Sequence, residues 1–347
     1  MNQNNVAREC VFLDACRGKQ TPYTPIWLNR QAGRYMLEYR QVKGDRKSIE
    51  FFTNPELAAE ITLIAQRLLN VDAAIVFADL LPILQPMGLQ LDYIPQMGPT
   101  FENPIRNTKD VNKLRTITAE EDTGYIAQTI QNVKQDLPTK IGLIGFAGAP
   151  FTLAAYAIEG RSTQHFNLVR TFMYSHPDSW MQLLDTITES VISYVKLQIQ
   201  AGIDVLQIFD SWIGCLAETE YLQYVYPFTQ RLFHSIANNV PTIYFGTSNA
   251  HLLKAMYSTG PNIMALDWRV NLVETWNNLG CRAIQGNLDP MTLCANTDLM
   301  LQHARNILDS VNHKPGHIFN LGHGITPTTD VDQVKKLVDF VHEYSQR

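Results

Sequence analysis

The sequence is poor in the features that mark secreted and membrane-spanning chains. Its five cysteines are odd in number and widely scattered, and no two of them form a Cys-x-x-Cys pair, so no disulfide framework is expected. No apolar run approaches the length that crosses a bilayer, and residues 1–10 lack the apolar core of a secretory signal. We therefore expect a reduced, soluble, cytoplasmic protein without membrane partners.

Charge is also scarce. Only 18% of the residues are charged, the net charge is -5, and there is no basic run that could neutralise a phosphate backbone. Nucleic acid is therefore not expected as a partner, and any anion must be captured by a few local cations. With 45% hydrophobic residues in 347, the chain can bury a large core, and barrel folds of this size form a single domain.

Short runs rich in β-forming residues recur along the chain, each followed by a longer stretch with helical signals. The eight runs are 24–28, 72–77, 141–146, 204–209, 242–246, 263–268, 283–288 and 317–321. They are almost continuously apolar, which is typical of parallel strands buried on both faces. Strand and helix alternating eight times predict an α/β fold, a single (β/α)8 TIM barrel over 1–347, with an open doubly wound sheet as the alternative.

Helix signals support this alternation. Asn54 followed by Pro55 is a typical helix start, and the segment from Pro177 to Gly202 has a typical start and stop. A last helix has its apolar residues on one face over 331–341. The remaining parts are an N-terminal segment, 1–20, and a long connection, 80–140. Pro, Gly and alternating residues at 89–94 predict an excursion on the barrel rim there, with a β-hairpin and then a helix.

Polar residues gather directly after these runs, where a barrel places its active site. They include Arg30, Arg34, Asp79, the Gly145–Pro150 turn with Tyr156, Ser211, Asp267, Asp289 and His323. On a helical turn after Leu28, Arg30 and Arg34 would share one face and form an anion clamp. Together these residues predict a pocket for a polyanionic small molecule.

Each of these residues also has an ordinary structural explanation. Arg34 could pair with Glu38 on an exposed helix, and Asp79 could cap the following turn. Tyr156 could be a half-buried core residue, and Asp267 and Asp289 could hold loops together.

Two kinds of chemistry are not expected. Ser211 lacks the glycines of a Gly-x-Ser-x-Gly elbow, so a serine hydrolase is discounted. His317 and His323 would lie about 20 Å apart along a strand, and no His-x-Cys or His-Glu-x-x-His pattern occurs, so no metal is expected.

Several stretches resemble the signatures of the uroporphyrinogen decarboxylase family, and the match covers nearly the whole chain. They are 30–35 (RQAGRY), 145–153 (GFAGAPFTL) with Tyr156 and Glu159-Gly160, 267–270 (DWRV), 285–290 (QGNLDP) and 320–325 (NLGHGI). The resemblance implies a single barrel, paired as a homodimer, that acts on a tetrapyrrole. It would remove carbon dioxide from the four acetate groups of uroporphyrinogen III, giving coproporphyrinogen III, without cofactor or metal.

The resemblance also implies roles for individual residues. Arg30 and Arg34 would bind substrate carboxylates, Arg30 being a conceivable proton relay, and Asp79 would face the pyrrole nitrogens. The other residues implied to bind substrate are Gln31, Ala32, Gly33, Lys43, Tyr156, Phe209, Ser211 and His323. Lys43 stands where family members commonly have another basic residue, often arginine, so a bidentate contact would be lost there.

Chemistry agrees with these roles, because a bond to carbon dioxide breaks only if its electrons have somewhere to go. A pyrrole protonated on carbon is a cationic electron sink, and a buried Asp79 carboxylate would stabilise it. Two alternatives stay open. One is a corrinoid-dependent methyltransferase of the same fold, which needs a zinc bound by His and Cys, and the other is a non-catalytic tetrapyrrole-binding protein, which needs the arginines but not Asp79.

Overall fold

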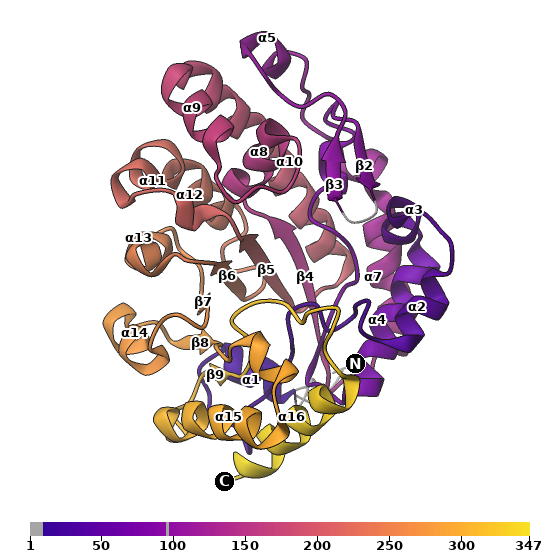
Figure 1. The fold of residues 1–347 in the computed structure, drawn as a ribbon, viewed down its shortest axis with the longest axis vertical. Helices are drawn as coiled ribbons and strands as arrows, with labels where there is room; N and C mark the ends of the chain where they lie inside the picture. Colours follow the sequence, from indigo (N-terminus) through magenta and orange to yellow (C-terminus); the bar gives the residue numbers. More distant parts are fainter. Residues whose placement is uncertain (1–9, 95–96) are drawn as a thin grey trace, which may run out of the picture.

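The computed structural model describes residues 10–94 and 97–347, and its centre is a curled, seven-stranded parallel sheet (Figure 1). The strand order is β1-β4-β5-β6-β7-β8-β9. The strands are β1 (Ala73–Ile75), β4 (Gly142–Gly148), β5 (Val205–Asp210), β6 (Thr242–Gly246), β7 (Ile263–Ala265), β8 (Ala283–Gln285) and β9 (His317–Ile318). The second to eighth predicted runs are therefore confirmed as strands, although β1, β7, β8 and β9 are shorter than expected.

The first predicted run, 24–28, forms no strand, but it is bonded on both sides. Phe319 N–H donates to Pro25 O at 2.8 Å, Ile26 makes a parallel bridge with Phe319, and Asp72 N–H donates to Ile26 O at 2.9 Å. Pro25 has no N–H, and the N–H of Ile26 donates to the Asp72 carboxylate at 2.8 Å instead of to a neighbouring strand. A regular ladder is therefore interrupted where this segment passes between β9 and the start of β1.

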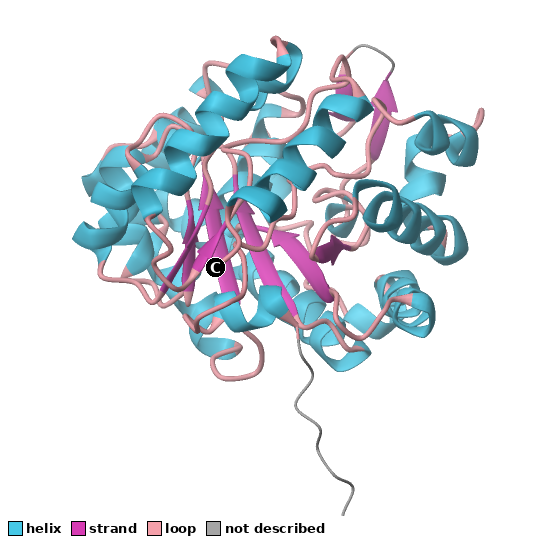
Figure 2. Cartoon of the chain, turned by 90° about the horizontal axis from the view of Figure 1, so that it is seen from below, coloured by secondary structure: helices cyan, strands magenta, loops and turns pink. Residues whose placement is uncertain are grey.

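Helices cover the sheet on the outside, and the strands are visible among them from two directions (Figures 1 and 2). They are α1 (Val11–Cys16), α2 (Leu37–Lys43), α3 (Ser48–Thr53), α4 (Pro55–Leu69), α5 (Thr108–Val111), α6 (Ala119–Asp122), α7 (Gly124–Asp136), α8 (Pro150–Glu159), α9 (Asn167–Ser175), α10 (Pro177–Ala201), α11 (Glu218–Tyr224), α12 (Tyr226–Ser235), α13 (Leu253–Tyr257), α14 (Leu272–Leu279), α15 (Thr297–Val311) and α16 (Val331–Tyr344). Short 3₁₀ turns are η1 (Pro82–Leu84), η2 (Ile213–Cys215), η3 (Ala250–Leu252) and η4 (Pro290–Cys294).

The predicted helix boundaries are confirmed. Asn54 caps α4 by accepting the Leu57 N–H at 2.9 Å, and Gly202 ends α10 in a left-handed conformation with φ 109°. No helix in the described parts of the chain combines the length and apolar character needed to cross a membrane.

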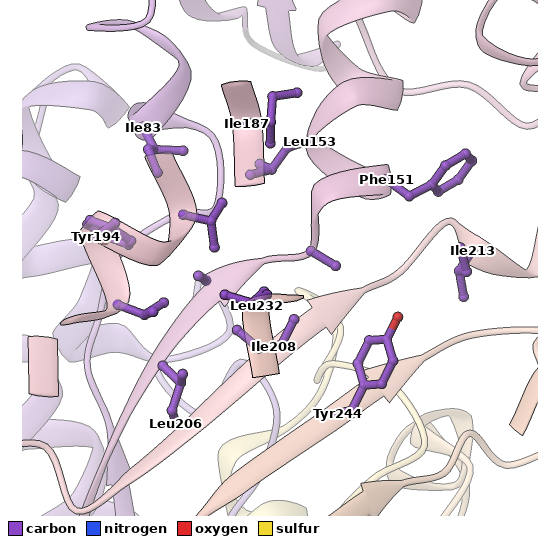
Figure 3. Close-up of a cluster of buried hydrophobic side chains, with 14 of the residues drawn as sticks. Ile83, Phe151, Leu153, Ile187, Tyr194, Leu206, Ile208, Ile213, Leu232 and Tyr244 are labelled. Carbon is purple, nitrogen blue, oxygen red and sulfur yellow. The ribbon is translucent and has the colours of Figure 1, made fainter. Parts of the chain in front are cut away.

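Alternate residues along the strands belong to two apolar clusters, so the sheet is buried on both faces. One cluster packs against α8 and α10, where Figure 3 shows side chains of the strands and the helices together. Its strand residues include Leu206, Ile208 and Tyr244, whereas Val205, Ile243 and Phe245 belong to the other cluster. Every residue of β4 is buried, in agreement with its glycine-rich, wholly apolar sequence.

A separate antiparallel hairpin, β2 (Leu91–Ile94) and β3 (Gly98–Phe101), stands apart from the parallel sheet (Figure 2). It is attached to the C-terminal end of α8, because Phe101 N–H donates to Gly160 O at 2.8 Å and Ile105 N–H donates to Ala157 O at 2.9 Å. Residues 95–96, within the predicted excursion, and 1–9, within the predicted N-terminal segment, lie outside the described residues.

Candidate functional site

Loops that follow four parts of the sheet meet at its C-terminal edge. Asp79 follows β1, Ser211 follows β5, Arg269 follows β7 and His323 follows β9. The segment 29–36 reaches the same edge, because residues 25–27 are bonded to the chain around β9. Parallel strands place their carboxyl ends together, so these loops form one mouth.

The two arginines do not lie on a helix, so the predicted helical clamp is wrong in this detail. Residues 29–36 form turns and bends, and α2 begins only at Leu37. Arg30 has φ 61°, in the left-handed region, which a right-handed helix cannot include. Both Arg30 and Arg34 are exposed, and among the described residues neither makes an ion pair, so the Arg34–Glu38 pair is absent there.

The turn formed by residues 29–36 is held by hydrogen bonds of Gln31, and buried side-chain amide groups lie beneath it. Gln31 N–H donates to Leu28 O at 3.0 Å, and the Gln31 side-chain amide donates to Ala73 O at 3.2 Å. Below it, a row of hydrogen bonds that we call the amide chain crosses the interior. Its members are Trp27, Gln285, Gln207, Asn29 and Asn320, each at most 3% exposed and joined in this order at 2.9, 3.1, 3.2 and 3.0 Å.

Gly324 makes room for the Arg30 side chain. A Cβ atom at position 324 would lie 2.7 Å from Arg30 Cγ and 2.9 Å from Arg30 Nε, which is closer than ordinary van der Waals contact. Ile325 N–H also donates to Asn29 O at 3.0 Å, so the two segments run side by side. Arg30 therefore lies directly against the loop that carries His323.

Asp79 caps a turn with one oxygen, as the structural alternative expects, and still faces the mouth. Its Oδ1 accepts the Leu81 N–H at 3.0 Å. Burial raises the pKa of Asp79, and the Leu81 N–H, the Tyr93 hydroxyl and the Arg30 guanidinium act in the opposite direction. Asp79 can therefore cap the turn and also face a substrate, because capping uses only one of its two carboxylate oxygens.

Tyr93 was not predicted as a site residue, although it lies beside Asp79. It comes from β2, its ring packs against Phe52 at 5.3 Å between centroids, and its hydroxyl is buried near Asp79 but outside the geometry of a direct hydrogen bond. Burial and then the Asp79 carboxylate raise the pKa of this hydroxyl. The only sequence signal was the alternation at 89–94, which predicts a strand but does not say which residue it points at the site.

His323 is half-buried between cationic side chains. Burial, followed by the charges of Arg30 and Arg269, lowers the pKa of His323 to about 4, against a smaller opposing effect of Asp267. The imidazole is therefore neutral near pH 7. Its ring meets that of Trp268 edge to face at 6.4 Å.

Aromatic rings form much of the remaining mouth. Tyr156 is half-buried and stacks on Trp212 with ring centroids 3.7 Å apart, and burial raises the pKa of Tyr156 to about 12. Phe209 meets Phe146 and Phe245 edge to face at 5.6 and 5.8 Å. These rings place apolar surface on the same strand ends and loops that carry the charged groups.

Some predicted residues lie elsewhere or have other partners. Lys43 is in the last turn of α2, where its ammonium donates to Arg46 O at 2.8 Å. No contact among the described residues brings Lys43 to Asp79. Asp289 caps η4 by accepting the Met291 N–H at 2.9 Å, so it holds a loop. Ala32, Gly33 and Ser211 are half-buried at the mouth, and the Ser211 carbonyl accepts the Thr247 hydroxyl.

Asp210 is a buried carboxyl that the sequence did not single out for a role. It accepts the hydroxyls of Thr152 at 2.7 Å and Tyr244 at 2.8 Å, and burial raises its pKa to about 6. Within 10–94 and 97–347 no group of three or more His, Cys, Asp and Glu side chains has the arrangement of a metal site.

Comparison with known proteins places this site in context. Residues 9–344 match the sequence model described as uroporphyrinogen decarboxylase (URO-D). The uroporphyrinogen decarboxylase of Roseiflexus sp. is 47% identical, with 96% of this chain and 98% of the relative covered, and that of Carboxydothermus hydrogenoformans is 44% identical, with 96% of each covered. A solved methyltransferase from Methanosarcina mazei has a TM-score of 0.81 at 20% identity over 96% of this chain and 97% of its own, which shows a shared fold.

Proposed function

This chain belongs to the uroporphyrinogen decarboxylase family, and we propose that it removes carbon dioxide from the four acetate groups of uroporphyrinogen III, giving coproporphyrinogen III. It is a carboxy-lyase of haem biosynthesis, and its substrate is a tetrapyrrole with carboxylates around its rim. The observation that carries the mechanism is the grouping of Arg30, Asp79 and His323 at one mouth, where the charge of Arg30 acts on both other groups.

Arg30 and Arg34 bind substrate carboxylates in this proposal. Both side chains are exposed and free of ion pairs with other described residues, so their charges are available to a ligand. A guanidinium can donate two parallel hydrogen bonds to one carboxylate, which fixes the orientation of an acetate group. Gln31, Ala32 and Gly33 contribute the backbone of the turn, and Lys43 acts at longer range from α2.

Asp79 stabilises the cationic pyrrole that forms when a ring carbon is protonated. Its second oxygen is not used by the Leu81 N–H, so it can accept from pyrrole N–H groups. Burial makes the carboxylate costly, and a cationic ring beside it offsets that cost. The stabilisation therefore grows as the ring becomes charged, which lowers the barrier to loss of carbon dioxide.

His323, Tyr156, Ser211 and Phe209 line the pocket. Neutral His323 serves as a hydrogen-bonding group rather than a cation, because its pKa is about 4. Phe209 and the Tyr156–Trp212 stack provide apolar surface for the macrocycle. Arg30 is a candidate proton relay, although a guanidinium is a weak acid at neutral pH.

The complete barrel is part of the same proposal. The segment 24–28 takes the place of the eighth strand, which its backbone hydrogen bonds to residues 319 and 72 support. The segment 80–140, with its hairpin, is an excursion on the barrel rim, and the 347 residues form one domain. The homodimer and the cytoplasmic location stay predictions from the sequence. The corrinoid-dependent methyltransferase is disfavoured by the relatives at 43–47% identity, because each of them is a uroporphyrinogen decarboxylase.

The test is incubation of the purified protein with uroporphyrinogen III under anaerobic, reducing conditions. Products are separated by their number of carboxyl groups, and we expect the eight-carboxylate substrate to disappear as the four-carboxylate product forms. Binding without turnover would instead support the non-catalytic tetrapyrrole-binding alternative. Failure of both binding and turnover would overturn the proposed function.

A further inference from the structure

We propose that Arg269 is a further substrate-binding residue, and that its guanidinium and that of Arg30 flank His323 and each contact a carboxylate of the tetrapyrrole. This rests on the proposed function and deepens it, because it places substrate-binding cations on two separate loops of the mouth. Neither Arg30 nor Arg34 can fill this role, since both belong to the single turn 29–36.

The loops after β7 and β9 are in direct contact, which brings Arg269 to His323. A Cβ atom at Gly322 would lie 2.9 Å from Asp267 C and 3.0 Å from Trp268 Cα, so only glycine allows this approach. On the other side of His323, Gly324 lies against the Arg30 side chain in the same way. The Gly-His-Gly sequence thus sits between two arginine-bearing segments.

Arg269 is held in one orientation. Its Nη1 donates to Asp267 Oδ2 at 2.8 Å, and its guanidinium carbon lies 3.8 Å from the centroid of the Trp268 ring. Asp267 is only 2% exposed and is itself fixed, because it also accepts the backbone N–H groups of Ser248 at 2.6 Å and of Arg269 at 2.9 Å. Ordering the arginine in advance reduces the entropy lost when a ligand binds.

The orientation leaves hydrogen-bond donors for a ligand. A guanidinium has five N–H donors, and the Asp267 carboxylate takes one of them. The Arg269 side chain is 46% exposed, and among the described residues its other N–H groups have no hydrogen-bond partner. The Asp267 carboxylate lies on the buried side, so it offsets the charge of Arg269 without covering its exposed edge.

A carboxylate partner and an aromatic contact alone do not make an arginine a substrate-binding residue. Arg231 is also half-exposed, paired with Asp185 at 2.7 Å and placed over the Phe228 ring at 5.6 Å. Arg269 differs in its position, because its guanidinium carbon lies 3.8 Å from the centroid of the Trp268 ring, and that ring meets the ring of His323 at 6.4 Å. A substrate with carboxylates on all sides of a ring needs cations on more than one side of the pocket, and Arg269 supplies the second.

The experiment compares the wild-type protein with Arg269→Gln, Arg269→Lys and the matched control Arg231→Gln. Steady-state kinetics with uroporphyrinogen III give KM and kcat, and fluorescence titration with the oxidised octacarboxylic porphyrin gives Kd without turnover. Thermal unfolding of each variant checks folding. For Arg269→Gln we expect KM and Kd to rise about tenfold, the low end for a charge-assisted bond, because the site is half-exposed.

We expect kcat of Arg269→Gln to change less than threefold, Arg269→Lys to recover part of the affinity, and Arg231→Gln to match the wild type. A purely structural role would instead lower the unfolding temperature without separating KM from kcat. KM and Kd within twofold of wild type in folded Arg269→Gln would overturn the proposal. If the wild type does not turn over uroporphyrinogen, the proposed function fails, whereas the porphyrin titration still decides whether Arg269 binds carboxylates.

Discussion

The contact between Gly324 and Arg30 predicts that one added methyl group disables the site. Gly324 has an ordinary φ, so alanine adds no backbone strain, and the change is confined to the space occupied by Arg30. The new Cβ would lie 2.7 Å from Arg30 Cγ, and ordinary contact begins at 3.4 Å. Arg30 Cδ would be closer still, so the arginine stem must move by roughly 1 Å.

The expected loss follows from what Arg30 does in the proposed mechanism. Complete loss of a charge-assisted hydrogen bond costs about 1.5–3 kcal/mol, which corresponds to about 10-fold to 150-fold in kcat/KM. Misplacement of a group near the chemistry by about 1 Å reaches a similar size. Because the Arg30 side chain is flexible and exposed, we expect Gly324→Ala to lower kcat/KM by about 10-fold to 100-fold, with little change in unfolding temperature.

The assay is steady-state decarboxylation by Gly324→Ala, Arg30→Ala and the double variant. Gly124→Ala is the matched control, because a Cβ at Gly124 would meet nothing within 4 Å. If Gly324 acts through Arg30, the double variant should be no slower than Arg30→Ala alone. The reasoning is refuted if Gly324→Ala keeps activity within twofold of wild type, or if the double variant is much slower than Arg30→Ala.

Further predictions concern the remaining charged groups. Asp79→Asn keeps an acceptor for the Leu81 N–H but removes the charge, so kcat should fall on the order of 100-fold while KM moves little; activity within about threefold of wild type would reduce Asp79 to a turn cap. Arg34→Ala should raise KM through a lost carboxylate contact of roughly 1.5–3 kcal/mol, and unchanged kinetics would place Arg34 outside the site. The pKa of buried Asp210 is raised to about 6, so its ionisation opposes folding as pH rises from its ordinary pKa of 3.8 to 6. Denaturant unfolding at pH 4 to 7 should therefore show Asp210→Asn gaining stability relative to wild type by on the order of 3 kcal/mol across that range, and a difference independent of pH would contradict this. Exhaustive chelation should leave the decarboxylation rate unchanged, whereas a loss restored by zinc would argue for the methyltransferase alternative.

The sequence predicted the strands well because buried parallel strands are short, apolar and regularly spaced. The runs at 141–146 and 204–209 correspond to β4 and β5, whose residues are almost all buried. Strand ends were less predictable, since the runs 263–268 and 283–288 form strands only over Ile263–Ala265 and Ala283–Gln285 and continue as loops. The run 24–28 looked like its neighbours, but Pro25 and the Asp72 side chain interrupt its ladder.

The sequence predicted which residues lie at the site better than it predicted how they are arranged. Asp79 and His323 were found because they follow strands, and parallel strands bring such residues together. The backbone conformation of Arg30 could not be predicted, because the spacing of four residues between Arg30 and Arg34 suggests a helix. No neighbouring residue indicates that Arg30 adopts a positive φ. Tyr93 was missed because it lies on a hairpin outside the parallel sheet, and the contacts of this hairpin with the end of α8 cannot be found from the sequence.

The amide chain beneath the arginine turn has a mechanical consequence. Hydrogen bonds are directional, so the row from Trp27 to Asn320 ties Asn29 to β5, to the end of β8 and to the loop after β9 at a defined position in the interior. Apolar packing would tolerate small shifts of the turn, whereas shortening one member of this row leaves buried donors and acceptors unpaired. The turn that carries the arginines can therefore be exposed to solvent and still keep a fixed position, because buried hydrogen bonds hold it from inside the fold.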